Sequence, residues 1–353
     1  MRIAFISHGL SDGGAERVAS IVANHYASLG HDVLYLAVLS PEQEYHLDPR
    51  IKYHYVEIGK STRLTRFLQR SMEIDRLIRE FRADVAVSFL IQEAIVTSIR
   101  KTVPLVYSLR IDPGVKCRKP VIRAFMLHSY RRAKRVIFQT RDARDFFEKK
   151  IRDKGVVIYN PLTQSLPYWQ ADSHEKRIIT ACRLTAQKNL PMLIRAFAAF
   201  HKLHPDYRLE IYGKGEELEN LQALTRTLCI EDAVHFPGHS TKIHEIMANS
   251  AMFVLSSDFE GLSNSMLEAL AIGVPSVCTD CPPGGAREFI TDGIGGMLVP
   301  VGDVEALTKK LRVTSSSPVP TSATATPMST LRPSAAAPAP ASTRTVWMLF
   351  TCT

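Results

Sequence analysis

The chain has 353 residues, with 44 Lys and Arg against 35 Asp and Glu, which gives a formal net charge of +9. This length suits about two domains, and the ordinary apolar content predicts a folded globular protein. No apolar run in the sequence reaches the roughly 20 residues that a membrane-spanning helix needs, and the N-terminal sequence lacks a secretory signal pattern. We therefore expect a cytoplasmic protein whose charge favours acidic partners: phosphorylated substrates, nucleic acid or an anionic membrane surface.

The first predicted elements along the chain form a β-α-β unit. An apolar run at residues 2–7 predicts a buried strand, which a loop with glycines follows. Apolar residues then recur at helical spacing from Val18 to Leu29, and Gly30 suits the end of that helix because it tolerates a positive φ. A second strand at residues 32–39 predicts a parallel sheet covered by helices. Further strands are predicted at residues 83–90, 103–109 and 133–140.

The sequence changes character at residues 156–176, which contain two prolines and end in polar residues. We interpret this stretch as an interdomain linker with its boundaries at residues 161–175, between domains at 1–160 and 176–311. The second α/β alternation has strands predicted at residues 177–184, 207–213, 234–238, 251–257 and 274–280, and helices at 190–203 and 216–228. Residues 312–353 are mostly Ser, Thr, Pro and Ala, which predicts a disordered low-complexity tail.

This order of elements predicts an α/β protein with two Rossmann-like, doubly wound domains facing a cleft. In such sheets ligands bind beyond the carboxyl ends of the strands, so the loops at those ends are the candidate sites. Six cysteines are scattered along the chain, and only Cys278 and Cys281 are close, as CTDC. Such a pair can be a redox site or half of a zinc site, but no second pair or histidine stands nearby to favour either role.

Gly13 and Gly14 stand between the first predicted strand and its helix. Without side chains they let a ligand approach the backbone, and the helix N-terminus behind them offers unpaired N–H groups to an anion. A tight structural turn explains a double glycine equally well. The stretch differs from the dinucleotide-binding GxGxxG fingerprint, because Ser40 and Pro41 stand where that motif expects an acid.

Arg183 and Lys188 lie in the turn after the first strand of the second predicted domain. Two fixed cations at the carboxyl end of a strand suit a diphosphate, and we favour this over a solvated basic loop. Gly213, at the end of the next strand, fits a plain turn as well as a ligand-facing loop.

The stretch DFEGLSNSMLEAL, residues 258–270, carries two carboxylates, Glu260 before a predicted helix and Glu268 inside it. Both would repel an anion, but both can accept hydrogen bonds from hydroxyls that flank it. An anion with hydroxyls on either side describes a nucleotide sugar. Taken singly, each acid is also explained as a helix cap or a surface residue.

The start of the same helix is a candidate anion site. Ser263 or Asn264 can cap the helix. Exposed amides of Gly261, Leu262 and Ser263 would then point at the anion.

Five motifs occur in order along the chain: GGAER, RLTAQKN, YGKGEEL, EGLSNSMLEAL and PPGGAREFITDGIGGMLVPVGD. Together they resemble the retaining family 4 glycosyltransferases with the GT-B fold, notably bacterial members that build surface polysaccharides. The resemblance runs from Met1 to about Leu311. It implies an acceptor-binding N-terminal domain and a C-terminal domain that binds a UDP-sugar.

The resemblance also implies roles for matched residues. Gly13 and Gly14 would approach the donor diphosphate, while Arg183 and Lys188 would hold the phosphates and stabilise the departing UDP. Glu260 would bind the transferred sugar.

Glu268 would bind the ribose in this scheme. Retention would come from acceptor attack on the face that UDP leaves, with the β-phosphate as base and without a protein nucleophile. The sequence has no Asp-x-Asp motif, which agrees with two cations in place of a metal ion, so we expect no metal and no further cofactor.

Two features depart from the family pattern. Relatives carry a histidine or an acid in the loop after the fourth strand, where this chain has Leu109, with Arg110 and Asp112 alongside. The closing helices that the family has after its last motif are also replaced by the atypical tail.

The segment at residues 115–136 mixes Val121, Phe125, Met126 and Leu127 with many Lys and Arg. Such a segment is typical of a membrane-surface binder, and in relatives this region approaches lipid-linked substrates. A buried helix with a solvated basic face is the alternative. Nucleic acid is disfavoured because aromatic stacking residues are few.

The sequence thus favours a retaining, metal-independent glycosyltransferase in the cytoplasm, peripherally bound to the inner membrane. It would move a hexose or N-acetylhexosamine from a UDP-sugar to a lipid-linked, lipopolysaccharide or capsule glycan. The alternatives are a nucleotide-sugar epimerase of the same fold and an inactive sugar-binding protein.

Overall fold

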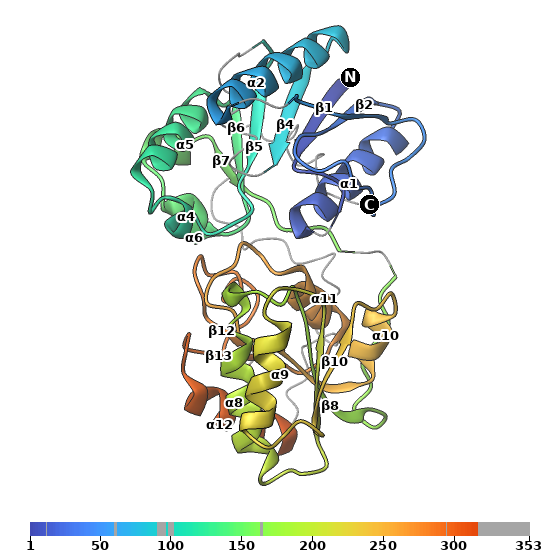
Figure 1. The fold of residues 1–353 in the computed structure, drawn as a ribbon, viewed down its shortest axis with the longest axis vertical. Coiled ribbons are helices and arrows are strands. Elements are labelled where there is room, and N and C mark those ends of the chain that lie inside the picture. The colour runs from blue at the N-terminus through green and yellow to red at the C-terminus, as the bar shows by residue number, and fades with distance from the viewer. Residues whose placement is uncertain are drawn as a thin grey trace, which may run out of the picture. The chain divides into compact units, whose positions relative to one another are not determined.

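The computed structural model describes residues 1–11, 13–59, 62–89, 97, 102–162, 165–293 and 295–316 (Figure 1). The chain divides into two compact units, of which the first ends at Pro161 and the second begins at Leu162. We call them the N-terminal and the C-terminal unit. None of the described helices combines the length and the apolar character that crossing a membrane requires.

The N-terminal unit contains a sheet of parallel strands in the order β3-β2-β1-β4-β5-β6-β7. The strands are β1 (Arg2–Ser7), β2 (Asp32–Ala37), β3 (Lys52–Tyr55), β4 (Val85–Phe89), β5 (Leu105–Ser108), β6 (Arg135–Phe138) and β7 (Gly155–Val157). The direction of the strand order reverses between β1 and β4. This reversal is the topological switch point, beside which doubly wound sheets bind their ligands.

Helices cover both faces of this sheet, because its central strands are apolar on both sides. On one face Val18 and Val22 of α1 share a buried cluster with Phe5 of β1. On the other face Ile74 of α2 and Tyr130 of α5 belong to a second buried cluster. The helices are α1 (Gly14–Ser28), α2 (Arg63–Glu80), α4 (Pro113–Lys116), α5 (Pro120–Arg132), α6 (Arg141–Asp145) and α7 (Lys149–Arg152).

The C-terminal unit repeats the design with parallel strands in the order β10-β9-β8-β11-β12-β13. Its strands are β8 (Glu175–Ala181), β9 (Arg208–Tyr212), β10 (Val234–Gly238), β11 (Ser250–Leu255), β12 (Ser276–Thr279) and β13 (Met297–Val299). Its helical elements are the short η1 (Ala186–Lys188), α8 (Leu190–His201), α9 (Leu218–Thr227), α10 (Ile243–Ala248), α11 (Asn264–Ile272) and α12 (Val304–Ser316). Leu193 and Phe197 of α8 and Leu307 and Leu311 of α12 pack in one apolar cluster with the strands.

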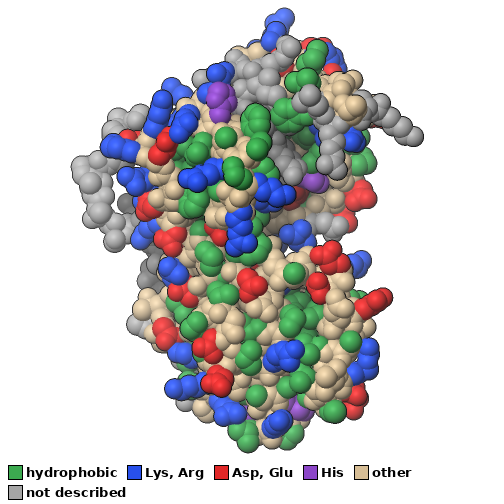
Figure 2. Space-filling view, turned by 60° about the vertical axis from the view of Figure 1, so that its left-hand side comes forward, with side chains coloured by type: hydrophobic (Ala, Val, Ile, Leu, Met, Phe, Trp, Pro, Cys, Tyr) green, Lys and Arg blue, Asp and Glu red, His purple; other side chains and the backbone are tan. Residues whose placement is uncertain are grey.

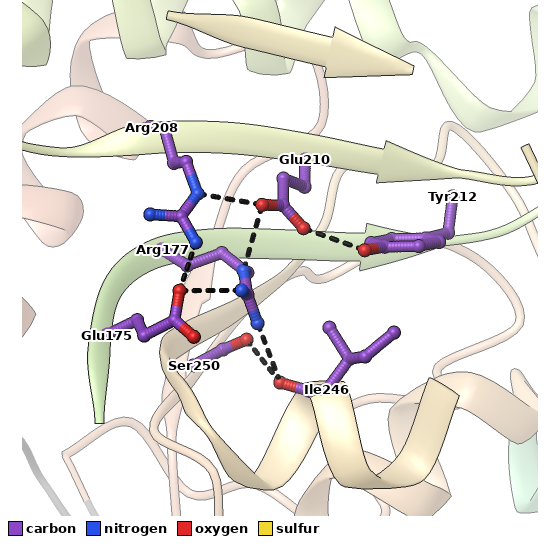
Figure 3. A network of polar contacts seen from close by, with 7 residues as sticks. All are labelled: Glu175, Arg177, Arg208, Glu210, Tyr212, Ile246 and Ser250. Atoms are coloured by element: carbon purple, nitrogen blue, oxygen red, sulfur yellow. Dashed lines mark hydrogen bonds and ion pairs between the residues drawn. The ribbon is translucent and has the colours of Figure 1, made fainter. Parts of the chain in front are cut away.

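A network of charged side chains lies on the C-terminal sheet and reaches α10 (Figure 3). Its members are Glu175, Arg177, Arg208, Glu210, Tyr212, Ile246 and Ser250. Arg177 Nε lies 3.0 Å from a carboxylate oxygen of Glu210, and Arg177 Nη2 donates to Glu175 at 2.7 Å. Arg177 Nη1 donates to the Ile246 carbonyl at 3.4 Å, so the network connects two strands with the second half of α10.

The predicted α/β architecture is confirmed, and β1 has the predicted bounds. The sequence did not predict β3, β7 or β13, which are short strands of three or four residues. The first unit ends at Pro161, beside the predicted start of the linker, but the predicted end of the linker is one residue late, because Glu175 already belongs to β8. Val156 and Val157 belong to β7, which pairs with β6.

The predicted start of the tail is also wrong, because α12 continues to Ser316. Thr314 is buried, and its hydroxyl donates to the Lys310 carbonyl at 2.8 Å. Tertiary packing here outweighs the weak helix propensity of Ser and Thr. Residues 317–353, which include the rest of the predicted tail, lie outside the described residues.

Candidate functional site

Two predicted site residues meet at the carboxyl edge of the C-terminal sheet. Lys188 ends η1 after β8, and its Nζ lies 2.5 Å from Oε1 of Glu260, which follows β11. The Ser257 hydroxyl donates to the same oxygen at 2.6 Å. The two charged side chains are only 11% and 10% exposed, so water screens their attraction weakly. The sequence predicted separate ligand contacts for them, and here they form a buried ion pair with each other.

This pair controls the local titration. Burial alone would lower the pKa of Lys188, but the Glu260 carboxylate outweighs it and raises the pKa above its ordinary value. Lys188 is therefore a cation at neutral pH. Burial raises the pKa of the nearby Cys182 thiol to about 11 and that of Cys281 to about 12, with a further contribution from Glu260. Burial raises the pKa of Cys278 as well, and a thiol held protonated is a poor nucleophile, which argues against the redox role considered for CTDC.

Hydrogen bonds fasten the loop after β8 to the loop after β11. Asn189 adopts a left-handed backbone, with φ of 42°, and its side chain caps α8 and donates to Asp258 at 2.7 Å. Gln187 donates to the Phe259 carbonyl at 2.8 Å and lies 3.4 Å from Glu260 Oε2. These contacts fix the positions of Lys188 and Glu260 before any ligand binds. Sequence reasoning gave no role of this kind to Gln187, Asn189 and Asp258, because their contacts join loops about 70 residues apart.

Arg183 lies in the same loop as Lys188, and Gly213 directly follows β9. The Arg183 side chain is exposed and forms no ion pair with any residue in the described ranges. Gly213 has φ of 132°, and a Cβ there would lie 1.8 Å from the carbonyl oxygen of Cys182. The backbone contact between the loops after β8 and β9 therefore requires glycine, which is a structural reason for this residue.

The start of α11 differs from the prediction in one respect. Ser263 caps the helix by accepting from the Met266 amide, as one of the two predicted caps. The residues expected to expose their amides, Gly261, Leu262 and Ser263, are buried. The segment that contains Gly285 packs against them, since a Cβ at Gly285 would lie 3.1 Å from the Gly261 carbonyl oxygen.

Glu268 is a buried carboxylate on α11, with 5% of its surface exposed. Its Oε2 lies 3.1 Å from Nε2 of His244, which projects from the first turn of α10. The sequence did not predict this histidine. No motif contains it, and it reaches Glu268 only because α10 packs against α11.

In the N-terminal unit Gly13 caps α1 without a side-chain hydrogen bond. Glu16 folds back over it, so that a Cβ at Gly13 would lie 1.6 Å from a Glu16 carboxylate oxygen. Gly14 is the first residue of α1. The binding roles of Gly13 and Gly14 remain predictions, and Glu16 is a buried acid at this helix end that the sequence did not single out.

The loop that departs from the family pattern has three distinct environments. Leu109 is 1% exposed and packs in the apolar core. Asp112 caps α4 by accepting from the Gly114 amide at 2.8 Å. Arg110 is buried beside Ser108 and Asn160. No group of three or more His, Cys, Asp or Glu at metal-binding distance occurs within the described part of the chain.

Sequence profiles of two glycosyltransferase groups match the two halves of the chain. Residues 12–164 match Glycosyltransferase Family 4, and residues 167–323 match Glycosyl transferases group 1. Two solved structures share the fold over about nine-tenths of both chains. HepE from Anabaena in complex with UDP has a TM-score of 0.74 at 19% identity, and apo WaaB, a lipopolysaccharide outer core galactosyltransferase, has 0.68 at 20%. The chain therefore belongs to the glycosyltransferases of the GT-B fold.

Among these enzymes it is of the type found in bacterial polysaccharide synthesis. It is 26% identical to an uncharacterized glycosyltransferase of Haemophilus influenzae over 87% of this chain and 88% of the relative. It is also 36% identical to a Campylobacter jejuni enzyme over 39% of this chain and 37% of that enzyme. The enzyme is named N-acetylgalactosamine-N,N'-diacetylbacillosaminyl-diphospho-undecaprenol 4-alpha-N-acetylgalactosaminyltransferase.

Proposed function

We propose that this protein transfers a hexose or N-acetylhexosamine from a UDP-sugar to a lipid-linked, lipopolysaccharide or capsule glycan, with retention of configuration. The observation that carries the proposal is the buried Lys188–Glu260 pair at the carboxyl edge of the C-terminal sheet, with the exposed cation Arg183 in the same loop. Cations and an oriented carboxylate together suit the two chemically different parts of a sugar diphosphate.

In this proposal the donor enters a site that its charges already organise. Lys188 and Arg183 bind the diphosphate and stabilise the negative charge that grows on UDP as the sugar bond breaks. Lys188 then shares its positive charge between the phosphate and Glu260. The freed acceptor sites of Glu260, which Ser257 holds in place, bind hydroxyls of the transferred sugar. Glu268 binds the ribose.

Retention follows from attack on the face that UDP leaves. The acceptor hydroxyl forms the new bond to the anomeric carbon as the bond to the β-phosphate breaks, and its proton passes to a β-phosphate oxygen. The protein supplies no nucleophile in this scheme. Its two cations take the place that a divalent ion has in other transferases, so the proposed reaction is independent of metal.

The donor and acceptor classes rest on what similar proteins are named for. HepE has been solved with UDP and with UDP-glucose. WaaB is named for the lipopolysaccharide outer core, and the Campylobacter jejuni relative is named for a diphospho-undecaprenol glycan. We carry these classes over to this chain as part of the proposal.

We further propose that α5 brings the protein to the cytoplasmic face of the inner membrane. Val121 and Phe125, one helical turn apart on α5, are 67% and 52% exposed, whereas Met126 is buried. Exposed basic residues lie near them in the sequence: Arg118, Lys119, Arg123 and Arg132. The face of the N-terminal unit visible in Figure 2 carries many Lys and Arg side chains with hydrophobic side chains between them. Such a surface attracts anionic headgroups and can insert apolar groups among them.

UDP release from a panel of UDP-sugars, with and without a membrane extract as acceptor, tests the proposal. We expect release that depends on the extract and a radiolabelled sugar that moves into the lipid or glycan fraction. Epimerised free sugar, or UDP-sugar binding without turnover in any extract, would contradict it.

A further inference from the structure

A buried cation lies at the carboxyl edge of the N-terminal sheet. Arg110, two residues after β5, has 8% of its surface exposed. Its Nε donates to the Ser108 hydroxyl at 2.8 Å, its Nη1 donates to Asn160 Oδ1 at 2.5 Å, and its guanidinium lies 5.1 Å from the ring centre of Phe89. Its Nη2 is buried and donates to no atom among the described residues.

The contacts that surround Arg110 carry no negative charge. Two are neutral polar side chains and the third is an aromatic ring, and no carboxylate of the described residues forms an ion pair with it. Burial lowers its pKa to about 9, so the group remains a cation at neutral pH. A buried charge without a partner is costly to fold. Arg177 of the C-terminal unit shows how a buried arginine is usually compensated, because the carboxylates of Glu175 and Glu210 neutralise its charge (Figure 3).

Gln139 adds an unused acceptor beside the unused donor. Asn160 Oδ1 already accepts from Arg110, so Gln139 must offer it a donor, which it does through Nε2 at 2.6 Å. This leaves Gln139 Oε1 buried and without a donor from the described residues. The cluster of Arg110, Gln139 and Asn160 therefore has one cationic donor and one acceptor to satisfy.

The position of the cluster matches a ligand site. Phe89 ends β4 and pairs in register with Ser108, which ends β5. β4 adjoins β1 at the switch point of the sheet, and ligands of doubly wound folds bind outside the carboxyl ends of the strands at that point. Leu109 faces the apolar core instead, so Arg110 is the polar group that this loop can present.

We propose that Arg110 and Gln139 bind an oxyanion of the acceptor and a hydroxyl next to it, as a sugar phosphate or a uronic acid provides. Nη2 of Arg110 donates to the oxyanion, which supplies the missing negative charge. Oε1 of Gln139 accepts from the neighbouring hydroxyl. The inference rests on the proposed function, since it places the acceptor in the N-terminal unit and gives it a chemical class.

The test measures binding of three probes by saturation-transfer NMR: glucose 1-phosphate, glucuronate and glucose. An Arg183→Ala, Lys188→Ala background removes the cations of the donor site, which would otherwise bind the same probes. We expect glucose 1-phosphate or glucuronate, but not glucose, to bind with an affinity that Arg110→Met lowers at least ten-fold. The stronger of the two anionic probes identifies phosphate or carboxylate as the acceptor group.

Gln139→Glu gives a second variant that removes the ambiguity of a folding defect. The new carboxylate would supply negative charge within the cluster, so we expect loss of anion binding, and urea unfolding checks that the variant is folded. Equal probe affinities in the parent, Arg110→Met and Gln139→Glu proteins would overturn the inference. UDP titration of the wild-type protein is a separate measurement, so a failure of the proposed donor site is distinguishable from a failure at Arg110.

Discussion

At the scale of single residues, the Lys188–Glu260 pair combines two tasks. It orients a carboxylate at the strand ends, and it keeps a cation charged where the proposed diphosphate binds. Either task fails when one partner is removed, because the other is left as a buried, unpaired charge.

We predict that Lys188→Ala lowers kcat for UDP release about 100-fold, since a donor to the developing negative charge is lost. The same substitution should lower the free energy of unfolding by about 3 kcal/mol. Steady-state kinetics and urea unfolding measure the two effects. Lys176→Ala is the control, because Lys176 is an exposed lysine paired with Asp206. Equal kcat values for the two variants would exclude the proposed role.

Glycine at position 213 provides a second prediction at this scale. Gly213→Ala would place a methyl group 1.8 Å from the Cys182 carbonyl oxygen at φ of 132°, so we expect a loss of more than about 3 kcal/mol of stability. Gly238→Ala is the matched control: φ is 81°, but no atom lies within 4 Å of the added group. Gly238→Ala should lower the free energy of unfolding by only about 1 kcal/mol, the cost of a positive φ for alanine. Similar unfolding midpoints in urea for both variants would show that the loop contact is wrong.

At the scale of elements, the network of Figure 3 makes the C-terminal unit sensitive to acid. Burial alone would raise the pKa of Glu210, but hydrogen bonds from Arg208 and Tyr212 and the charge of Arg177 lower it below its ordinary value. A carboxyl group whose pKa is lowered on folding stabilises the protein above its unfolded pKa. That contribution is lost as the pH falls through the folded pKa.

Glu210→Gln should therefore lose about 2 kcal/mol at neutral pH, where the charged hydrogen bonds are fully formed. The difference from the wild type should shrink as the pH falls below the ordinary glutamate pKa of about 4.3 and through the lower folded pKa of Glu210. Urea unfolding at several pH values measures this. Asp206→Asn removes an exposed carboxylate, so its free energy of unfolding should stay close to that of the wild type at every pH. A difference for Glu210→Gln that stays constant with pH would contradict the assignment.

Helix α10 is the second element whose position matters. The network holds its Ile246 carbonyl, and its His244 contacts Glu268, so the helix aligns the carboxylate that we propose binds the ribose. We predict that His244→Ala raises the Kd of UDP about 10-fold, a change of about 1.4 kcal/mol, because Glu268 would lose the contact that orients it. Calorimetric titration measures it, with the exposed His235→Ala as control. Unchanged UDP affinity would show that His244 has no role in binding the donor.

At the scale of the whole molecule, the net charge of +9 predicts attraction to anionic membranes. Co-sedimentation with phosphatidylglycerol vesicles should be strong at low salt. It should weaken well above about 0.1 M salt, where charges are screened beyond about 10 Å. A Val121→Ser, Phe125→Ser variant should bind several-fold less, whereas Leu29→Ser, at an exposed apolar residue of α1's C-cap, should bind like the wild type. If vesicle binding changes neither with salt nor with the α5 substitutions, α5 is not the membrane-binding surface.

The whole molecule also shows what the sequence could predict. Apolar periodicity locates the central strands and helices because each of them buries a continuous face, as β1 and α8 do. The short strands β3, β7 and β13 have too few residues for a pattern, and pairing with a neighbour defines them. The motifs singled out the loops of Lys188 and Glu260, whose side chains contact each other in the structure. They could not show that the two side chains bind each other, or that His244 lies on Glu268, because such contacts depend on packing between distant segments.

The loops after β8 and β9 contact each other through main-chain atoms, with no side chain between them. A Cβ atom at Gly215 would lie 2.2 Å from the Leu184 carbonyl oxygen, and a Cβ atom at Gly213 would clash with the Cys182 carbonyl oxygen in the same way. Point mutations would therefore rarely give resistance to an inhibitor that hydrogen-bonds to these main-chain atoms. A codon change alters a side chain and leaves the peptide group in place, and the bulky replacements that could block such a drug do not fit.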